Sequence, residues 1–151
     1  MGSFPKHRVV LMVIAGLLVL MDHTCEAQHH EPEREPPLIR GSVHIKMQNA
    51  LADKSATLTV HCSGLLEGED DDLGSHDVAP GSTYEFRFET DSISVTSYNC
   101  SFQWPPKNSQ NFNIFSQGRD GRDGDFYWLV SDSGPCLVDV GTGNEDCKIW
   151  S

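Results

Sequence analysis

The sequence predicts an all-β protein: a small antiparallel β-sandwich of about seven or eight strands stabilised by two disulfides. Two observations lead to this fold class. Short segments of alternating apolar and polar residues follow one another along the chain, separated by clusters rich in Gly, Pro, Asn and Asp. An even number of cysteines also remains once the N-terminal region is set aside.

Each alternating segment places its apolar side chains on one face. The first aligns Val43, Ile45 and Met47, and a later one aligns Phe102 with Trp104. Successive side chains of a strand point to opposite faces, so these residues are predicted to form the core between two sheets. The predicted strands lie in residues 42–48, 56–62, 82–89, 97–104, 111–115, 125–130 and 135–140.

Residues 1–27 have the organisation of a secretory signal peptide. Lys6 and Arg8 precede an apolar run at residues 9–21, and Cys25-Glu26-Ala27 puts small residues at −3 and −1 of a cleavage site. The run is shorter than the roughly 20 residues that a membrane-spanning helix needs. We therefore expect a secreted, extracellular protein without membrane insertion.

The remainder of the chain divides into two parts. Residues 28–41 are polar and proline-rich and are predicted to be a flexible leader, and residues 42–151 are predicted to form one sandwich domain. The net charge of −11 argues against affinity for nucleic acid or anionic membranes, since both require clustered Lys and Arg. We expect a monomer without a cofactor.

The cysteines of the mature chain are predicted to form two disulfides, because Cys25 lies in the signal peptide and four others remain. No spacing typical of zinc ligands is present. Cys62 and Cys100 each share a face with apolar neighbours, which favours a Cys62–Cys100 bond that clamps the two sheets face to face. Cys136–Cys147 would then close the last strand onto the tail, while Cys62–Cys136 with Cys100–Cys147 stays open.

Two charged segments are candidates for recognition. The stretch "HCSGLLEGEDDDLGSH" carries Asp70, Asp71 and Asp72, and "GRDGRDGD" contains Arg119 and Arg122. Neither has EF-hand spacing, and consecutive carboxylates of an extended chain point to opposite sides, so no metal site is predicted. We interpret both as solvated inter-strand loops that a partner protein reads, with a calcium-binding extracellular module as an alternative.

No constellation of residues predicts catalysis. The adjacent Ser75, His76 and Asp77 have the residue types of a triad, but their side chains diverge. His61 and Asp72 could act as a base and its orienting partner only if folding brought them together. We therefore predict that the chain is not an enzyme, and a secreted defence-related protein or wall-acting enzyme is the alternative.

Asn99-Cys100-Ser101 is an N-glycosylation sequon. Asn99 alternates with Cys100 along its predicted strand and should therefore point away from the core, toward solvent. Asn99 is thus a candidate glycosylation site, which would make the protein a glycoprotein.

Several of these segments together resemble a known family. "LTVHC", "DDDLG", "PGSTYEFRF", "CSFQW", "FNIF" and "GPC" occur in this order between about residues 43 and 140, and the ordered set is similar to the plant self-incompatibility S1 family, or S-protein homologues. Members are described as small secreted β-sandwich proteins, and the founding members are stigma proteins that act as ligands for a pollen receptor in poppy. The resemblance implies an extracellular ligand in cell–cell signalling, with a cell-surface receptor protein as its partner.

The resemblance also bears on single residues. Cys62, Cys100 and Cys136 match family cysteines, and the three aspartates from Asp70 match the family's acidic motif. The family commonly has Cys-x-Trp where this chain has Phe126-Tyr127-Trp128, so one cysteine is missing. Cys147, further along the chain, would then take the bonding role of that cysteine.

Overall fold

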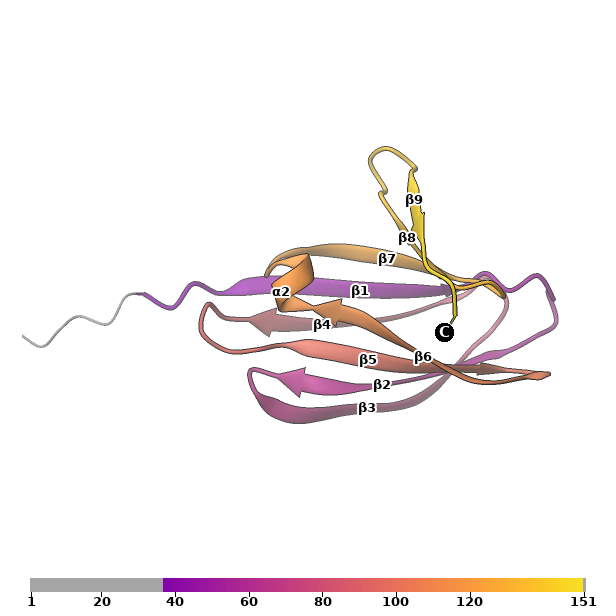
Figure 1. Cartoon of the computed structure of the whole chain (residues 1–151), viewed down its shortest axis with the longest axis horizontal. Helices are drawn as coiled ribbons and strands as arrows, with labels where there is room; N and C mark the ends of the chain where they lie inside the picture. The colour runs from indigo at the N-terminus through magenta and orange to yellow at the C-terminus, as the bar shows by residue number, and fades with distance from the viewer. Residues whose placement is uncertain (1–36, 151) are drawn as a thin grey trace, which may run out of the picture. The chain divides into compact units, whose positions relative to one another are not determined.

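A computed structural model describes residues 37–150, and two β-sheets stacked face to face make up this part of the chain (Figure 1). The predicted signal peptide, most of the predicted leader and Ser151 lie outside the described residues. The all-β sandwich with two disulfides is confirmed. The strands are β1 (Gly41–Asn49), β2 (Leu58–Leu66), β3 (Glu69–Val78), β4 (Thr83–Thr90), β5 (Ser97–Trp104), β6 (Lys107–Ser116), β7 (Gly124–Val130), β8 (Pro135–Val138) and β9 (Glu145–Cys147).

One sheet has the strand order β4-β1-β7-β8-β9 and the other has the order β3-β2-β5-β6. All neighbouring strands are antiparallel except β1 and β7, which run parallel in the middle of the larger sheet. The described residues thus contain nine strands and one parallel pairing, where seven or eight antiparallel strands were expected. Alternation along a strand identifies its buried face but not its neighbour, so the parallel pair could not be predicted from it.

The core lies between the two sheets, where the predicted apolar faces meet. Val43, Ile45 and Met47 of β1 are fully buried, as are Phe102 and Trp104 of β5. An aromatic cluster joins the sheets beside them: the Phe88 ring centroid lies 4.9 Å from that of Tyr98 and 5.1 Å from that of Phe115. Such ring pairs stabilise a core beyond the apolar area that they bury.

The bond between Cys62 and Cys100 is present but does not clamp the two sheets together. β2 and β5 are neighbours in the same sheet, and their register places Cys62 directly opposite Cys100. The pairing was predicted correctly from the shared apolar face, whereas the expected face-to-face bridge between sheets was wrong. Both sulfurs are buried on the inner side of the four-stranded sheet.

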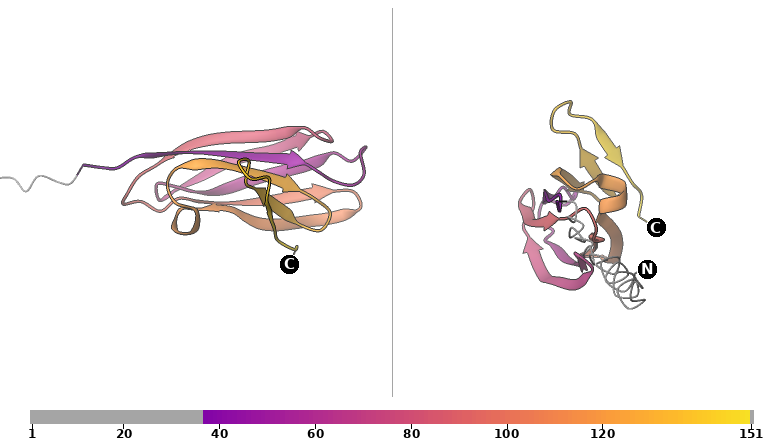
Figure 2. Two further views of the ribbon diagram at one scale, coloured as in Figure 1. Left: turned by 90° about the horizontal axis from the view of Figure 1, so that it is seen from above. Right: turned by 90° about the vertical axis from the view of Figure 1, so that its left-hand side faces the viewer.

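Cys136 and Cys147 form the second disulfide, which joins β8 to β9 as expected. These two strands form a hairpin that stands away from the body of the sandwich (Figures 1 and 2). After the hairpin the chain returns to the core, where the Trp150 ring lies 5.5 Å from the Phe102 ring and 5.8 Å from the Trp104 ring. The C-terminal segment is therefore attached twice, by the disulfide at Cys147 and by the packing of Trp150 against the core.

Three elements were not predicted. β3 occupies the acidic half of "HCSGLLEGEDDDLGSH", which was expected to be an inter-strand loop, because β2 continues to Leu66 and a two-residue turn at Glu67-Gly68 reverses the chain. Both turn residues have positive φ, 52° and 86°, as the tight hairpin turns that match strand twist require. β9 and the one-turn helix α2 (Gln117–Asp120) are the other two. No helix among the described residues is long and apolar enough to cross a membrane.

Candidate recognition surface

Three connecting segments meet at one end of the sandwich, on the left in Figure 1. They are the β2–β3 turn at residues 66–69, the β4–β5 loop at residues 91–96, and residues 117–123, which include α2. We call these three segments the end surface. Loops held on a rigid scaffold are where binding residues usually lie.

Hydrogen bonds join the three segments to one another. The Gly68 N–H donates to the Val95 carbonyl at 3.1 Å, which ties the turn to the loop. Thr96 joins the loop to the third segment, because its carbonyl accepts a hydrogen bond from the Gln117 N–H at 3.0 Å. The Gln117 side-chain amide also donates to the Asp91 carbonyl at 2.8 Å. The end surface is therefore one connected unit rather than three independent loops.

Asp91 organises the middle loop from within. This buried carboxylate accepts hydrogen bonds from the Ser94 and Ile93 N–H groups and from the Ser94 hydroxyl. These bonds, the Ser94 N–H first, hold the pKa of Asp91 below its usual range. The ionised carboxylate therefore stabilises the folded loop.

The Asp91→Asn variant should lose part of the pH dependence of folding. The folded-state pKa of Asp91 is lowered, so its stabilising effect is present above the unfolded value, about 4, and disappears as pH falls through the folded value. We expect the difference in unfolding free energy between wild type and variant to be largest near pH 7 and to shrink below about pH 4. Urea unfolding at pH 7, 4 and 2.5 measures this difference, and a constant difference would contradict the assignment.

Two apolar side chains stand out from the end surface. Ile93 is 81% exposed and Val95 is 65% exposed, both on the loop that Asp91 organises. A hollow of about 760 Å³ lies on one side of this loop, lined by Val95, Gln117, Arg122 and several serines. A hollow of about 330 Å³ is lined by the turn and the start of β3, including Glu67, Glu69 and Asp70. The surface thus combines exposed apolar side chains with an acidic flank and a flank that contains Arg122.

The three consecutive aspartates of β3 have different surroundings. Asp70 is exposed beside the turn, whereas Asp71 accepts a hydrogen bond from the buried Tyr98 hydroxyl. Burial, followed by this bond to a carboxylate, raises the pKa of Tyr98, so the phenol keeps its proton. Gly64 lies between Tyr98 and Asp71 in the strand register, and a Cβ there would clash with the Ser97 carbonyl. The predicted divergence of consecutive carboxylates agrees with this geometry.

Asp72 and His61 do meet, which the sequence could not establish. The Asp72 Oδ1 atom lies 2.7 Å from His61 Nε2, and a bond from the Gly74 N–H, followed by the one from His61, lowers the Asp72 pKa. An irregularity in the β2–β3 pairing between His61 and Ser63 brings the pair together. Among the described residues no hydroxyl or thiol donates to this imidazole, so the pair lacks the nucleophile that a catalytic triad requires.

Arg119 and Arg122 are both in the end surface but have different contacts. Arg119 is held by its neighbour in α2 and by β6, with Nε 2.7 Å from Asp120 Oδ1 and Nη1 3.0 Å from Asn113 Oδ1. Arg122 lines the larger hollow, and its carbonyl accepts from the Thr90 hydroxyl. Arg122 is therefore the better placed of the two to contact a partner.

Asn99 lies on the outer face of the four-stranded sheet, away from the end surface. Its side chain is exposed, and its amide oxygen accepts from Asn113 Nδ2 at 3.1 Å. The orientation agrees with the predicted one, and glycosylation of Asn99 stays a prediction.

One polar site was missed by the sequence analysis. His44 of β1 is only 4% exposed and lies between two carboxylates, with Nδ1 2.9 Å from Asp125 and Nε2 3.1 Å from Glu85. Carboxylates accept hydrogen bonds, so a ring nitrogen that carries a proton can donate to the carboxylate that it faces. Glu85 and Asp125 come from the strands on either side of β1, so this contact helps to join β4, β1 and β7.

The comparisons with known proteins show the family of the chain. Residues 44–150 match the model of the family described as plant self-incompatibility protein S1. The chain belongs to this family. S-protein homolog 2 of Arabidopsis thaliana is 32% identical over 162 aligned positions, which cover 99% of this chain and 97% of that protein.

Other S-protein homologues match a smaller share of this chain. S-protein homolog 4 of Arabidopsis thaliana is 37% identical over 71% of both chains. S-protein homolog 3 of the same plant is 34% identical, and the match spans 61% of its length. The S1 match extends to residue 150, so the tail beyond Val140, which the motifs did not explain, is part of the family domain.

Proposed function

We propose that this S1-family protein is a secreted ligand that binds a cell-surface receptor protein through the end surface. The observation that carries the proposal is the exposed Ile93–Val95 pair on a loop that hydrogen bonds hold against both neighbouring segments. Preorganised loops lose little conformational entropy on binding. Apolar side chains at the centre of a polar rim are typical of protein interfaces.

Secretion is supported by the predicted signal peptide and by the two disulfides. Structural disulfides form and persist in oxidising compartments, such as the route of protein export. The family relation supports a role in signalling between plant cells. Rejection of self pollen is a narrower role that rests on resemblance alone.

Receptor binding is a better proposal than catalysis or calcium binding. The His61–Asp72 pair lies exposed on a strand pair rather than in either hollow of the end surface. The aspartates of β3 do not converge, because Asp71 is engaged by Tyr98 and Asp72 by His61. The exposed carboxylates nearest the turn are instead placed to attract a basic receptor surface and to accelerate association.

A binding assay with plant plasma-membrane vesicles tests the proposal. Mature protein, residues 28–151, would be labelled at its N-terminus and titrated with vesicles. We expect Ile93→Ser with Val95→Ser to weaken saturable binding at least tenfold, as loss of central apolar contacts does. Glu67→Gln, Glu69→Gln and Asp70→Asn together should slow association and reduce its salt dependence.

Ile149→Ser is the matched control, because this side chain is 85% exposed but lies outside the end surface. It should leave saturable binding of the mature protein unchanged. Equal losses in the control and in the Ile93/Val95 variant would overturn the proposal, as would the absence of saturable binding by the wild-type protein.

A further inference from the structure

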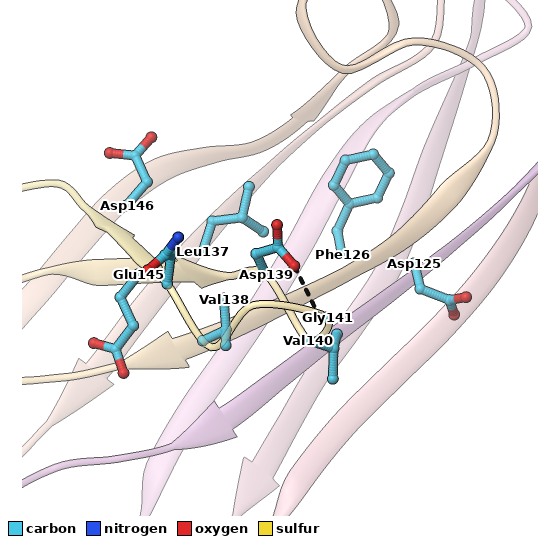
Figure 3. Close-up of a pocket in the computed structure, with 10 residues that line it drawn as sticks. Asp125, Phe126, Leu137, Val138, Asp139, Val140, Gly141, Glu145 and Asp146 are labelled. Atoms are coloured by element: carbon cyan, nitrogen blue, oxygen red, sulfur yellow. Dashed lines mark hydrogen bonds between the residues drawn. The ribbon is translucent and has the colours of Figure 1, made fainter.

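The hairpin of β8 and β9 creates a second hollow that the end surface does not include. This groove has a volume of about 480 Å³ and lies where the hairpin leaves the body of the sandwich (Figure 3). Its lining comes from β7, from both hairpin strands and from the turn between them. The volume lies within the range of about 300–1,000 Å³ that is common for ligand pockets.

The middle of the groove is apolar. Phe126, Leu137 and Val138 line it, and Val140 beside them is 74% exposed. Side chains alternate along β8, so Leu137 lies on the face of Asp146, and Val138 lies on the opposite face with Glu145. An apolar surface left open in this way favours an occupant that carries apolar groups of its own.

Carboxylates surround the apolar middle. Asp125 lies at one end, Glu145 and Asp146 at the other, and Asp139 lies between them (Figure 3). No lysine or arginine is among the described residues that line the groove. The occupant that complements this lining is therefore both basic and apolar.

Some of these carboxylates already contact cations of the chain. Lys148 Nζ lies 2.8 Å from Asp146, and Lys46 Nζ lies 3.9 Å from Asp125, which also contacts the His44 ring at 2.9 Å. Asp139 and Glu145 have no such cation among the described residues. Hydrogen bonds from the Thr142 and Gly141 N–H groups lower the pKa of Asp139 and keep it ionised.

The groove is preformed. The Cys136–Cys147 disulfide joins the two strands at the base of the hairpin. At its tip, Asp139 N–H donates to the Asn144 carbonyl at 2.8 Å, and Gly143 N–H donates to the Asp139 carbonyl at 2.7 Å. A groove that is held open by covalent and hydrogen bonds binds without the cost of ordering its own backbone.

We propose that this groove binds an extended, lysine- or arginine-bearing segment of a partner protein. The aliphatic part of a basic side chain lies along Val138 and Val140, and its charged group reaches Glu145, which is directly opposite Val138 on β9. Apolar side chains of the same segment also pack against Val138 and Val140, on the same side of the hairpin as Glu145 (Figure 3). This surface is separate from the end surface, so one molecule can contact two partner segments at once.

Peptide titration followed by NMR tests the inference on the oxidised mature protein, residues 28–151, labelled with ¹⁵N. The probe is an acetylated, amidated peptide that alternates lysine and valine over six residues. We expect saturable shifts confined to amides of residues 125–126 and 137–146. A lysine–glycine peptide should bind at least fivefold more weakly, and a glutamate–valine peptide should produce no shifts in this region.

Paired variants separate this site from general attraction of cations to an acidic protein. Glu145→Gln and Val140→Ser should each reduce the affinity for the lysine–valine peptide about fivefold. Glu69→Gln and Ile93→Ser make comparable changes on the end surface and should leave the affinity for this peptide unchanged. Shifts scattered over the acidic surface, or equal losses from Glu145→Gln and Glu69→Gln, would overturn the inference while leaving receptor binding through the end surface untouched.

Discussion

Replacing Cys62 and Cys100 together by alanine is expected to lower the free energy of unfolding by about 4 kcal/mol. The bond joins residues 38 positions apart, so its loss restores considerable freedom to the unfolded chain. Both side chains are buried opposite each other on β2 and β5, so alanine also removes packed sulfur atoms from the core. Urea unfolding of the wild-type and variant proteins under oxidising conditions measures the loss.

The second disulfide provides the comparison. Cys136 and Cys147 are 11 positions apart, so the same chain-entropy argument predicts a smaller loss of about 3 kcal/mol for their replacement by alanine. A loss below about 1 kcal/mol for the Cys62/Cys100 variant would show that the bond adds little to what the β2–β5 pairing already supplies.

Trp150→Ala should destabilise the protein by about 3 kcal/mol, at the lower end for a large aromatic residue because this side chain is only partly buried. The indole lies against Phe102 and Trp104, and its Nε1–H donates to the Ser131 carbonyl at 3.1 Å. Alanine removes the ring contacts and this hydrogen bond together. Thermal and urea unfolding, with tryptophan fluorescence as a second signal, measure the effect.

Two neighbouring substitutions separate the ring contacts from the hydrogen bond. Trp150→Phe keeps an aromatic ring against Phe102 but removes the N–H, so a loss of about 1 kcal/mol is expected. Ile149→Ala changes a side chain that is 85% exposed and should alter stability by less than about 0.5 kcal/mol. Equal effects of Trp150→Ala and Ile149→Ala would contradict a role for the tail in the core.

The sequence predicted those parts of the fold whose burial alternates. β1 and β5 have one wholly apolar face, so their positions followed directly from the pattern. β3 was missed because its acidic residues have low strand propensity, and because an edge strand needs little apolar surface. Its charges also protect that edge from pairing with other chains.

The candidate surfaces were predicted only in part. Asp70, Arg119 and Arg122 lie in or beside the end surface, but the loop with Ile93 and Val95 was missed. In "DSISVT" the spacing Asp-x-x-Ser indicates a carboxylate that can bind the next backbone amides, and this signal was available. The His61–Asp72 contact depends on an irregularity in strand pairing, which no local pattern encodes.

The parallel pairing of β1 with β7 affects how this chain folds as it is made. β1 pairs with β7 across about 80 residues, for example Val43 with Gly124, which are 81 positions apart. The four-stranded sheet is drawn entirely from residues 58–116 and can assemble earlier during synthesis. One edge of β1 stays open until β7 has emerged, so the larger sheet closes later in synthesis than the four-stranded sheet.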